Sequence, residues 1–410
     1  MTTTGPCEVG GSGRCASVLC ALPSGDNDEE AGMALQTDRY ETVVVGGGQA
    51  GLATGYHLAR QGRDFVILDA SERVGDAWRK RWDSLRLYSP AGYDGLPGMP
   101  FPARRTSYPT THEMADFLEA YAVRFNLPVR SGTAVDRLSK DGERYVVTSG
   151  DQRFEADDVV VATGCMQKPY LPGFASELDP RIRQLHSSDY RNLSQLQDGS
   201  VLVVGASHSG ADIAYEAAPA HDTILSGPDT GQIPASVDTR RGRMGFRVLF
   251  FLGSHILTVD TPIGRTMRPH IRHGGAPLLR HRKKDLRDAG VERTLAKTVG
   301  VQDGRPVLAD GRVLDVGNVV WCTGFRPDYS WIDVPFELGD DGYPVQYRGV
   351  VESAPGLYFV GLLFLHSFTS MLIAGTARDA GRVAEHIAAH RATSRATASS
   401  AVSVAGQVAS

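Results

Sequence analysis

Short runs of consecutive apolar residues alternate with stretches of helical periodicity along most of this chain. The apolar runs at residues 42–45 and 201–204 each lead through a glycine-rich turn into such a stretch, and another short apolar run follows. A buried strand, a tight turn and an amphipathic helix are typical of a parallel strand–helix–strand unit. The pattern predicts two such units: a strand at 40–45, a helix at 50–61 and a strand at 64–68, then a strand from 200, a helix at 210–217 and a strand at 223–225.

The remaining patterns add a small antiparallel sheet and a long C-terminal helix. The predicted elements are a helix at 114–125, strands at 134–138, 144–148 and 153–155, apolar strands at 158–162, 318–322 and 357–360, and a helix from about 370 to 390. Two of the apolar strands lead into the same dipeptide, Thr163-Gly164 and Thr323-Gly324. The second unit lies between them, so we expect the chain to cross between domains near 165–170 and again near 318–328.

The first glycine-rich turn reads Gly46-Gly47-Gly48-Gln49-Ala50-Gly51. In a dinucleotide fingerprint, the first glycine allows the sharp turn, the second lets the backbone approach a pyrophosphate, and the third lets helix and strand pack closely. The phosphates rest on the helix N-terminus, where free N–H groups and the helix dipole favour negative charge. Asp69 closes the following strand, where a carboxylate can bind ribose hydroxyls. These residues predict one dinucleotide site; the alternative is a glycine turn without a ligand.

The second turn, Gly205-Ala206-Ser207-His208-Ser209-Gly210, has the same context, with a small serine where the middle glycine is usual. About 20 residues further on, an NAD site has an acid and an NADP site has a nearby arginine. This chain has Leu225-Ser226-Gly227-Pro228 there, which offers neither. Arg240, with Arg241 and Arg243 close by, can fold back onto a 2′-phosphate or belong to a solvated basic loop. We favour NADPH.

Two dinucleotide sites in one chain are the layout of an enzyme that carries a flavin and takes electrons from a nicotinamide. We predict an α/β fold with two Rossmann-like dinucleotide-binding domains, the NAD(P) domain being inserted into the FAD domain. The predicted parts are a disordered tail at 1–37, an FAD-binding domain at 38–168 and 318–390, an NAD(P)-binding domain at 169–317 with a substrate-covering insertion at about 233–287, and a disordered tail at 391–410.

Composition and charge narrow the classes of function. The apolar fraction of 41% and the charged fraction of 22% are those of a globular protein, and the net charge of −4 gives no reason to expect nucleic acid. None of the five cysteines forms a C-x-x-C pair, which argues against a disulfide reductase with a redox dithiol. No histidine and cysteine spacing indicates a metal site.

The longest apolar segment, residues 246–259, contains Arg247, Gly253, Ser254 and His255. It is shorter than the about 18 apolar residues that a membrane span needs, so we predict core or pocket wall there. The N-terminus has no basic segment of the kind that opens a signal peptide, and we expect a cytoplasmic protein. A homodimer is compatible with the sequence.

Several further segments resemble the flavin-containing monooxygenase family, which includes the plant indole-pyruvate monooxygenases. The matching segments are Val74-Gly75-Asp76-Ala77-Trp78-Arg79, Ser209-Gly210-Ala211-Asp212-Ile213-Ala214 and Trp321-Cys322-Thr323-Gly324-Phe325. The resemblance implies that Trp78 and Arg79 contact FAD. It also implies that Gly361 and the start of the final helix border the flavin ring. His186 and Tyr190 match the second half of a family fingerprint, and His186 is expected to organise the region between the domains.

The resemblance implies a monooxygenase whose reduced FAD, formed with NADPH, takes up O₂ and delivers one oxygen atom from a C4a-hydroperoxyflavin to a small organic substrate. No side chain need act as a nucleophile, so we assign no catalytic residue. Many members place an asparagine beside the flavin where this chain has Tyr88-Ser89. Two alternatives stay open: an NAD(P)H oxidase or flavin reductase without oxygen transfer, and a non-catalytic flavoprotein that senses redox state.

Overall fold

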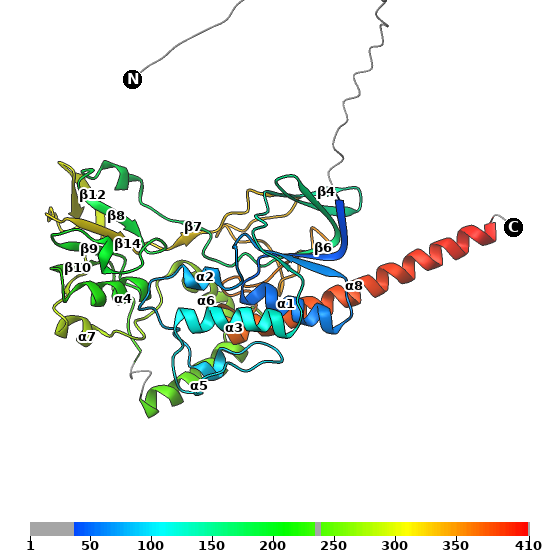
Figure 1. Cartoon of the computed structure of the whole chain (residues 1–410), viewed down its shortest axis with the longest axis horizontal. Coiled ribbons are helices and arrows are strands. Elements are labelled where there is room, and N and C mark those ends of the chain that lie inside the picture. Colours follow the sequence, from blue (N-terminus) through cyan, green and yellow to red (C-terminus); the bar gives the residue numbers. More distant parts are fainter. Residues whose placement is uncertain (1–36, 234–238, 409–410) are drawn as a thin grey trace, which may run out of the picture. The chain divides into compact units, whose positions relative to one another are not determined.

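The computed structural model describes residues 37–233 and 239–408, and Figure 1 shows how its elements follow one another along the chain. Most of the tail predicted at residues 1–37 lies outside the described residues. Thr37 itself is the first residue of strand β1.

The first sheet is built around the first strand–helix–strand unit. Its eight strands follow the order β16-β4-β5-β6-β1-β2-β3, with β17 paired to β6 outside this path. The strands are β1 (Thr37–Val45), β2 (Phe65–Leu68), β3 (Val129–Arg130), β4 (Arg137–Asp141), β5 (Arg144–Ser149), β6 (Gln152–Val161), β16 (Ile332–Asp333) and β17 (Leu357–Phe359). Val44 faces one apolar core whereas Val43 and Val45 face another, because successive side chains of a strand point to opposite faces.

Strand β6 differs from the prediction, because the segments 153–155 and 158–162 form one continuous strand. Its first half pairs antiparallel with β5, and its whole length pairs parallel with β1. No glycine or proline interrupts residues 152–161, so nothing in the backbone stops the strand between the two predicted segments.

The second sheet has five parallel strands in the order β11-β10-β9-β14-β8. They are β8 (Arg183–His186), β9 (Val201–Val204), β10 (Thr223–Ser226), β11 (Glu292–Thr294) and β14 (Asn318–Trp321). Because β14 pairs with β8 and β9, the domain boundary predicted at residue 318 is wrong by one strand. The chain returns to the first domain only after Trp321.

The two crossings between the domains lie side by side. β7 (Lys168–Pro169) and β15 (Phe325–Arg326) pair antiparallel, and the Tyr170 amide donates to the Gly324 carbonyl at 2.9 Å. An ion pair of 2.6 Å joins Lys168 to Asp328. The domain built on the second sheet therefore leaves and rejoins the first domain at one place. A further antiparallel pair, β12 (Thr298–Gln302) and β13 (Arg305–Leu308), lies within the inserted domain.

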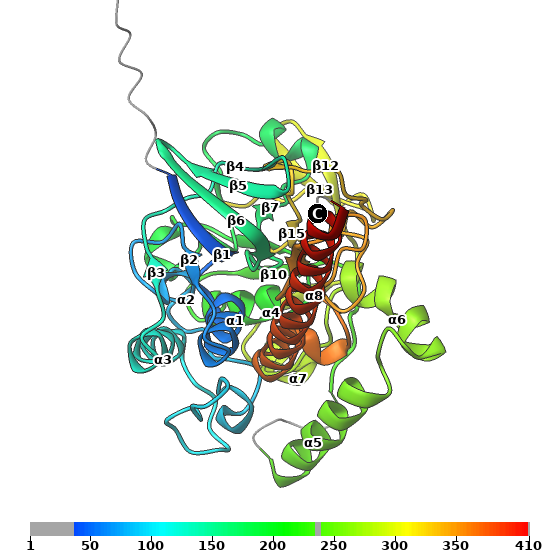
Figure 2. The same ribbon diagram turned by 90° about the vertical axis from the view of Figure 1, so that its right-hand side faces the viewer.

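Helices cover the sheets, and Figure 2 shows α1 and α8 side by side. The α-helices are α1 (Gln49–Arg60), α2 (Asp76–Arg79), α3 (Thr111–Arg124), α4 (His208–Ala217), α5 (Arg240–His255), α6 (Pro262–His273), α7 (Lys283–Asp288) and α8 (Ile373–Val408). Short 3₁₀ helices are η1 (Ala91–Tyr93), η2 (Gly173–Glu177), η3 (Leu193–Gln195) and η4 (Phe368–Met371).

Helix α8 continues past residue 390, where the composition predicts a tail. The segment from 391 to 405 is rich in alanine and contains neither glycine nor proline. Alanine has the highest helix propensity, so the backbone conformation of the preceding turns can propagate through it.

Candidate cofactor site and active site

The first glycine-rich turn is closed by contacts that leave no room for side chains. Gly46 has a φ of +109°, and a Cβ there would lie 2.6 Å from the carbonyl oxygen of Ala162. A Cβ on Gly51 would overlap the carbonyl oxygen of Gly46. Both positions therefore need glycine for the strand and the helix to meet at this distance.

Gly48 lies in the same turn but faces open space. A Cβ built on it would meet no atom within 4 Å. Gly48 is also the N-cap of α1, where no side chain caps the helix and no acid occupies its first turn. The first N–H groups of α1 are therefore available to an anion, and the space at Gly48 suits a diphosphate.

Asp69 lies against this turn, as the sequence predicts. Its Oδ2 accepts a hydrogen bond from the Gly47 amide, and its Oδ1 accepts one of 2.7 Å from the Ser71 amide. A Cβ on Gly47 would lie 2.9 Å from the Cβ of Asp69, so glycine allows the carboxylate to approach. Ribose hydroxyls bound beside the first turn would meet this carboxylate.

Two other predicted residues also lie at the start of α1. The Trp78 indole donates to Oε1 of Gln49 at 3.3 Å. Gly361 follows β17 with a φ of +82°, and a Cβ there would lie 2.9 Å from the Cβ of Ala50. Residues distant in sequence therefore meet around one helix N-terminus.

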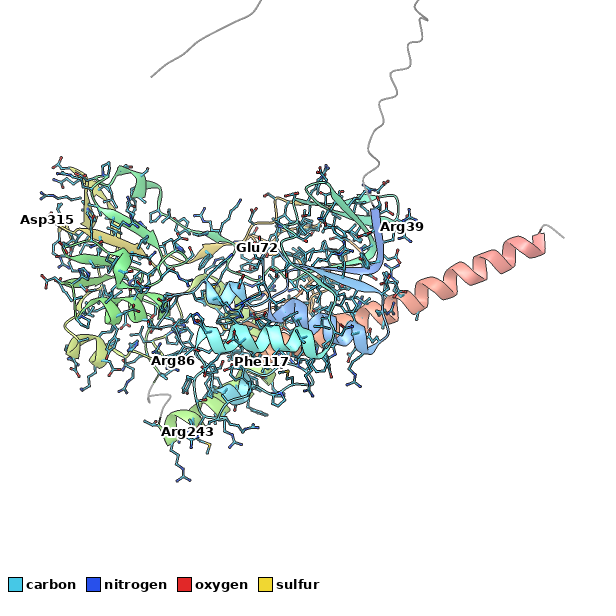
Figure 3. The ribbon with its side chains drawn as sticks, viewed as in Figure 1. Arg39, Glu72, Arg86, Phe117, Arg243 and Asp315 are labelled. Atoms are coloured by element: carbon cyan, nitrogen blue, oxygen red, sulfur yellow. The ribbon has the colours of Figure 1, made fainter. Side chains whose placement is uncertain are left out.

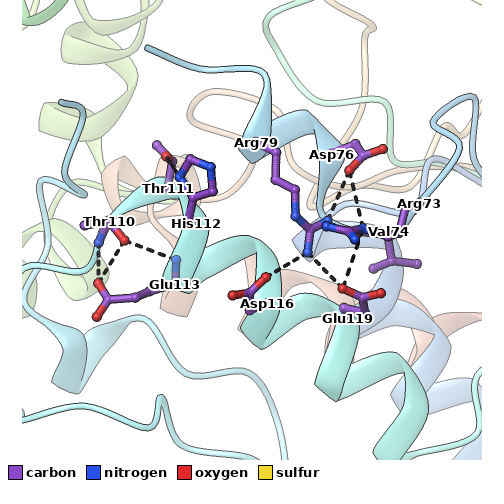
Figure 4. A network of polar contacts seen from close by, with 10 residues as sticks. All are labelled: Arg73, Val74, Asp76, Arg79, Thr110, Thr111, His112, Glu113, Asp116 and Glu119. Carbon is purple, nitrogen blue, oxygen red and sulfur yellow. Dashed lines mark hydrogen bonds and ion pairs between the residues drawn. The ribbon is translucent and has the colours of Figure 1, made fainter. Parts of the chain in front are cut away.

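Arg79 has a different environment from Trp78. Figure 4 shows its guanidinium between α2 and α3, where it donates to Asp76 at 3.1 Å, Asp116 at 2.9 Å and Glu119 at 2.8 Å. It also donates to the carbonyl of Val74 at 2.8 Å. These four bonds explain the position of the guanidinium, and its contact with FAD stays a prediction.

The second glycine-rich turn repeats the geometry of the first. Gly205 has a φ of +107°, and a Cβ there would overlap the carbonyl oxygen of Cys322. A Cβ on Gly210 would overlap the carbonyl oxygen of Gly205. Helix α4 begins after Ser207 without a side-chain cap, so its N-terminus presents free N–H groups as that of α1 does.

The middle positions of the second turn contact the loop at residues 275–277. The Ser207 hydroxyl donates to the Ala276 carbonyl at 2.9 Å, and Nε2 of His208 lies 2.7 Å from the Pro277 carbonyl. Burial lowers the pKa of His208 to about 4, so the imidazole is neutral and donates from Nε2. The side chain of His208 is therefore occupied by its hydrogen bond to this loop. Ser209 lies in the first turn of α4, where its backbone amide points toward the helix N-terminus.

A guanidinium lies at the end of β10, where the sequence offers no arginine. It belongs to Arg293 of the neighbouring strand β11. Arg293 donates to the carbonyls of Leu225 at 3.1 Å, Gly227 at 2.7 Å and Pro228 at 3.0 Å. Arg240, which the sequence suggests as a ligand for the 2′-phosphate, is the first residue of α5 and is exposed.

Hydrogen bonds join the two domains beside the second turn. The Tyr88 hydroxyl donates to Oδ2 of Asp212 at 3.0 Å, and its ring lies 4.5 Å from that of His208. Burial raises the pKa of Asp212 to about 6. At the crossing, Nε2 of the buried His186 lies 3.1 Å from the Gly324 carbonyl, in agreement with the organising role predicted for this histidine.

A cavity of about 400 Å³ lies between the segment that follows α2 and the segment that precedes α7. It carries two arginines, Arg86 and Arg280, and several hydroxyl groups; Figure 3 labels Arg86. Its lining residues are Arg86, Leu87, Tyr88, Thr106, Ser107, Tyr108, Leu279 and Arg280. Two cations and hydroxyl donors suit a carboxylate or a phosphate.

Within residues 37–233 and 239–408, no group of three His, Cys, Asp or Glu side chains is placed to hold a metal ion. In the same part of the chain, no helix is both long enough and apolar enough to cross a membrane.

Comparison with known proteins places the chain in a family. Residues 43–228 match the model of the pyridine nucleotide-disulphide oxidoreductases. The chain is 40% identical over 341 residues to an uncharacterized CzcO-like oxidoreductase of Geobacillus kaustophilus, with 83% of this chain and 96% of that relative covered. Among solved structures, the flavin-containing monooxygenase of Stenotrophomonas maltophilia is 29% identical, with a TM-score of 0.69 and 86% of this chain and 99% of the other covered. This chain belongs to the family of the CzcO-like oxidoreductases, and it is similar to flavin-containing monooxygenases.

A plant monooxygenase is similar over the same range. The probable indole-3-pyruvate monooxygenase YUCCA9 of Arabidopsis thaliana is 27% identical over 377 residues, covering 84% of this chain and 87% of the plant protein. The family membership and the two glycine turns confirm the predicted α/β fold with two dinucleotide-binding domains, and they establish a flavin-dependent oxidoreductase that uses a pyridine nucleotide.

Many flavin-containing monooxygenases have an asparagine at the place where this chain has Tyr88 and Ser89. The Ser89 hydroxyl donates to Oδ1 of Asp94, and both residues are buried. Oδ2 of Asp94 has no hydrogen-bond partner. Burial raises the pKa of Asp94 to about 7, although the bond from Ser89 opposes this shift. Neither hydrophobic periodicity nor a motif indicates this acid in the sequence.

Replacing Asp94 by asparagine is expected to stabilise the protein at pH 8 and to have little effect at pH 5. The pKa of the folded state lies above the unfolded value of about 3.9, so the folded state binds more protons between these values. Stability therefore falls as the pH rises from about 4 to about 7 and levels off above that. Thermal unfolding at the two pH values measures the effect. Asp315→Asn, at an exposed carboxylate (Figure 3), is the control. An equal change in Tm at both pH values for Asp94→Asn would contradict the shifted pKa.

The prediction of core or pocket wall at residues 246–259 is only partly correct. Phe246 and Phe250 pack on Tyr93, with ring centroids 5.0 Å and 4.7 Å away. Phe251 and Leu252, in contrast, are 58% and 42% exposed. A continuous apolar run on a helix covers all sides of it, so one face can pack on the protein while the other faces outwards.

Proposed function

We propose that this protein is an FAD- and NADPH-dependent monooxygenase that inserts one oxygen atom from O₂ into a small organic substrate. The observation that carries the proposal is the pair of matching glycine turns, each at an uncapped helix N-terminus, in two domains joined by paired crossings. Relatives named as monooxygenases cover most of the chain. Bound FAD would supply hydride acceptance from the nicotinamide and reaction with O₂.

The residues of this chain would contribute binding, orientation and the exclusion of water. Gly46 to Gly51, with Asp69, Trp78 and Gly361 around them, would hold FAD, whereas Gly205 to Gly210 would hold the diphosphate of NADPH. The Tyr88–Asp212 bond would fix the two nucleotide sites relative to each other. Efficient oxygen transfer depends on such positioning, because water must be kept from the reacting atoms.

Arg293 supports NADPH over NADH. Its charge lies at the end of β10, the place where a nicotinamide site distinguishes a 2′-phosphate from a 2′-hydroxyl. The nearest acid along the chain, Asp229, is paired with Lys283 and accepts from the Gly231 amide at 2.9 Å. A ribose 2′-hydroxyl would therefore meet a cation rather than a free carboxylate.

Replacing Arg293 by glutamine is expected to lower kcat/KM for NADPH by about 10- to 100-fold, because a charge-assisted bond to phosphate is lost. The value for NADH should change much less. Steady-state rates of NADPH and NADH oxidation measure the ratio, and Arg240→Gln is the matched comparison at the arginine that the sequence favoured. A preference for NADPH that falls in Arg240→Gln but not in Arg293→Gln would contradict this assignment.

We propose that the substrate is a 2-oxo acid. Arg86 and Arg280 offer two cations to a carboxylate, and the plant relatives are named for indole-3-pyruvate.

The test supplies the FAD-loaded protein with NADPH, ¹⁸O₂ and indole-3-pyruvate and follows product mass and hydrogen peroxide. One ¹⁸O atom in the product supports a monooxygenase. Peroxide in equal amount to the NADPH consumed, with no labelled product from this or other carbonyl substrates, would support an oxidase instead. Tight binding of both nucleotides without NADPH consumption would support a sensor.

A further inference from the structure

Helix α5 exposes an apolar face. Met244, Val248, Leu249, Phe251 and Leu252, which we call the outer face of α5, are each between 38% and 58% exposed. The positions 244, 248, 251 and 252 follow the spacing of one helical face. Large apolar side chains gathered in this way leave a considerable area in contact with water, and such patches usually mark an interaction surface.

The opposite face of α5 is already packed. The Ser254 hydroxyl lies 3.1 Å from that of Thr369, and a Cβ on Gly253 would lie 2.8 Å from the ring of Phe368. Phe246 and Phe250 contact Tyr93 on the same side. These contacts with η4 and η1 hold the helix in its orientation. Since the opposite face is the one that packs on the protein, the outer face is left exposed to solvent.

Positive charge predominates on α5 and on the following helix α6. Arg240 and Arg247 on α5 and Arg265 on α6 are exposed. Between residues 239 and 284 the sequence has a single acid, Asp260, and its carboxylate pairs with Arg348. Helix α6 adds two more exposed apolar residues, Ile263 at 54% and Met267 at 39%. The region combines apolar side chains with arginines that have no acid on these two helices to neutralise them.

We propose that the outer face of α5 binds the surface of an anionic phospholipid bilayer. An amphipathic helix with an apolar face and flanking arginines lies in the interface, with its apolar side chains among the acyl chains and its cations at the phosphates. This binding is peripheral and does not depend on the proposed reaction.

Charge favours a lipid surface over a second copy of the chain. In a two-fold dimer built on this face, the arginines of both copies would surround one interface, and neither copy would supply a carboxylate from α5 or α6. Anionic lipids provide the missing negative charge and a medium for the apolar side chains.

The test is co-sedimentation of the FAD-loaded full chain with vesicles of phosphatidylcholine alone and with added phosphatidylglycerol. We expect binding to the anionic vesicles, weakened by salt, and little binding to the neutral ones. Phe251→Ser and Met244→Ser should each lower the partition coefficient by about tenfold, because one large apolar side chain no longer inserts. Arg247→Gln should weaken binding to anionic vesicles only.

Val123→Ser is the matched control, because Val123 of α3 is 77% exposed outside this region. It should bind vesicles as the wild type does. FAD content, measured by absorbance, shows that each variant folds. The proposal is overturned if anionic and neutral vesicles bind equally, if Val123→Ser loses binding as Phe251→Ser does, or if sedimentation without vesicles shows a dimer that Phe251→Ser dissociates.

Discussion

Replacing Gly210 by alanine is expected to abolish reduction of the flavin by NADPH while FAD stays bound. A Cβ at this position would overlap the carbonyl oxygen of Gly205, so α4 would have to move away from β9. The N–H groups at the start of α4 would then lose their place beside the turn, and displacement of a bound reactant by about 1 Å can cost about 100-fold in rate. The first turn lies in the other domain and is unaffected.

Stopped-flow measurement of flavin bleaching by NADPH tests this expectation, with the FAD absorbance as the measure of the first site. Gly245→Ala is the control, because Gly245 is also a helical glycine and a Cβ there would meet no atom within 4 Å. Reduction of Gly210→Ala at the rate of the wild type would show that the nicotinamide does not bind at the second turn.

Replacing Gly48 by valine is expected to give a folded protein that has lost its yellow colour. Gly48 has a φ of −75° and ψ of −173°, which valine adopts readily, and a Cβ there would meet no protein atom within 4 Å. The side chain would instead fill the space that suits the diphosphate, so FAD affinity should fall by two orders of magnitude or more, about 3 kcal/mol. Gly51→Ala should lose FAD and also lower the Tm, because its Cβ would overlap the Gly46 carbonyl and push α1 away from β1.

FAD content after gel filtration and thermal unfolding of the apoprotein separate these effects. Gly173→Val is the matched control, since a Cβ on Gly173 also meets open space. If the Gly48→Val protein retained its full FAD content, the diphosphate would not bind at the first turn.

The sequence predicts those features that depend on local spacing. A strand, a glycine turn and a helix follow one another within about 20 residues, so Gly46, Gly51, Gly205 and Gly210 could be placed before any tertiary contact was known. The order of the domains follows from the repeated Thr-Gly dipeptides. The same reasoning assigned β14 to the wrong domain, because the sequence of an apolar strand does not indicate which sheet the strand joins.

Features that depend on strand pairing or on packing partners could not be predicted. Arg293 lies far along the chain from β10 and comes to its end only because β11 pairs with that strand. Asp94 and Ser89 meet through an irregular segment that has no periodicity. For α5 the sequence shows which residues are apolar, but only the packed contacts of Phe246 and Phe250 show which face of the helix is left outside.

The pairing of β7 with β15 means that the inserted domain enters and leaves the first domain at one place. A short loop could therefore join the two ends of the remaining chain without stretching it, and the excised segment would have neighbouring termini of its own. Such a segment can be exchanged as a cassette. A nicotinamide domain from another family member, grafted at this junction, would give a chimera that inherits its coenzyme preference from one parent and its flavin from the other.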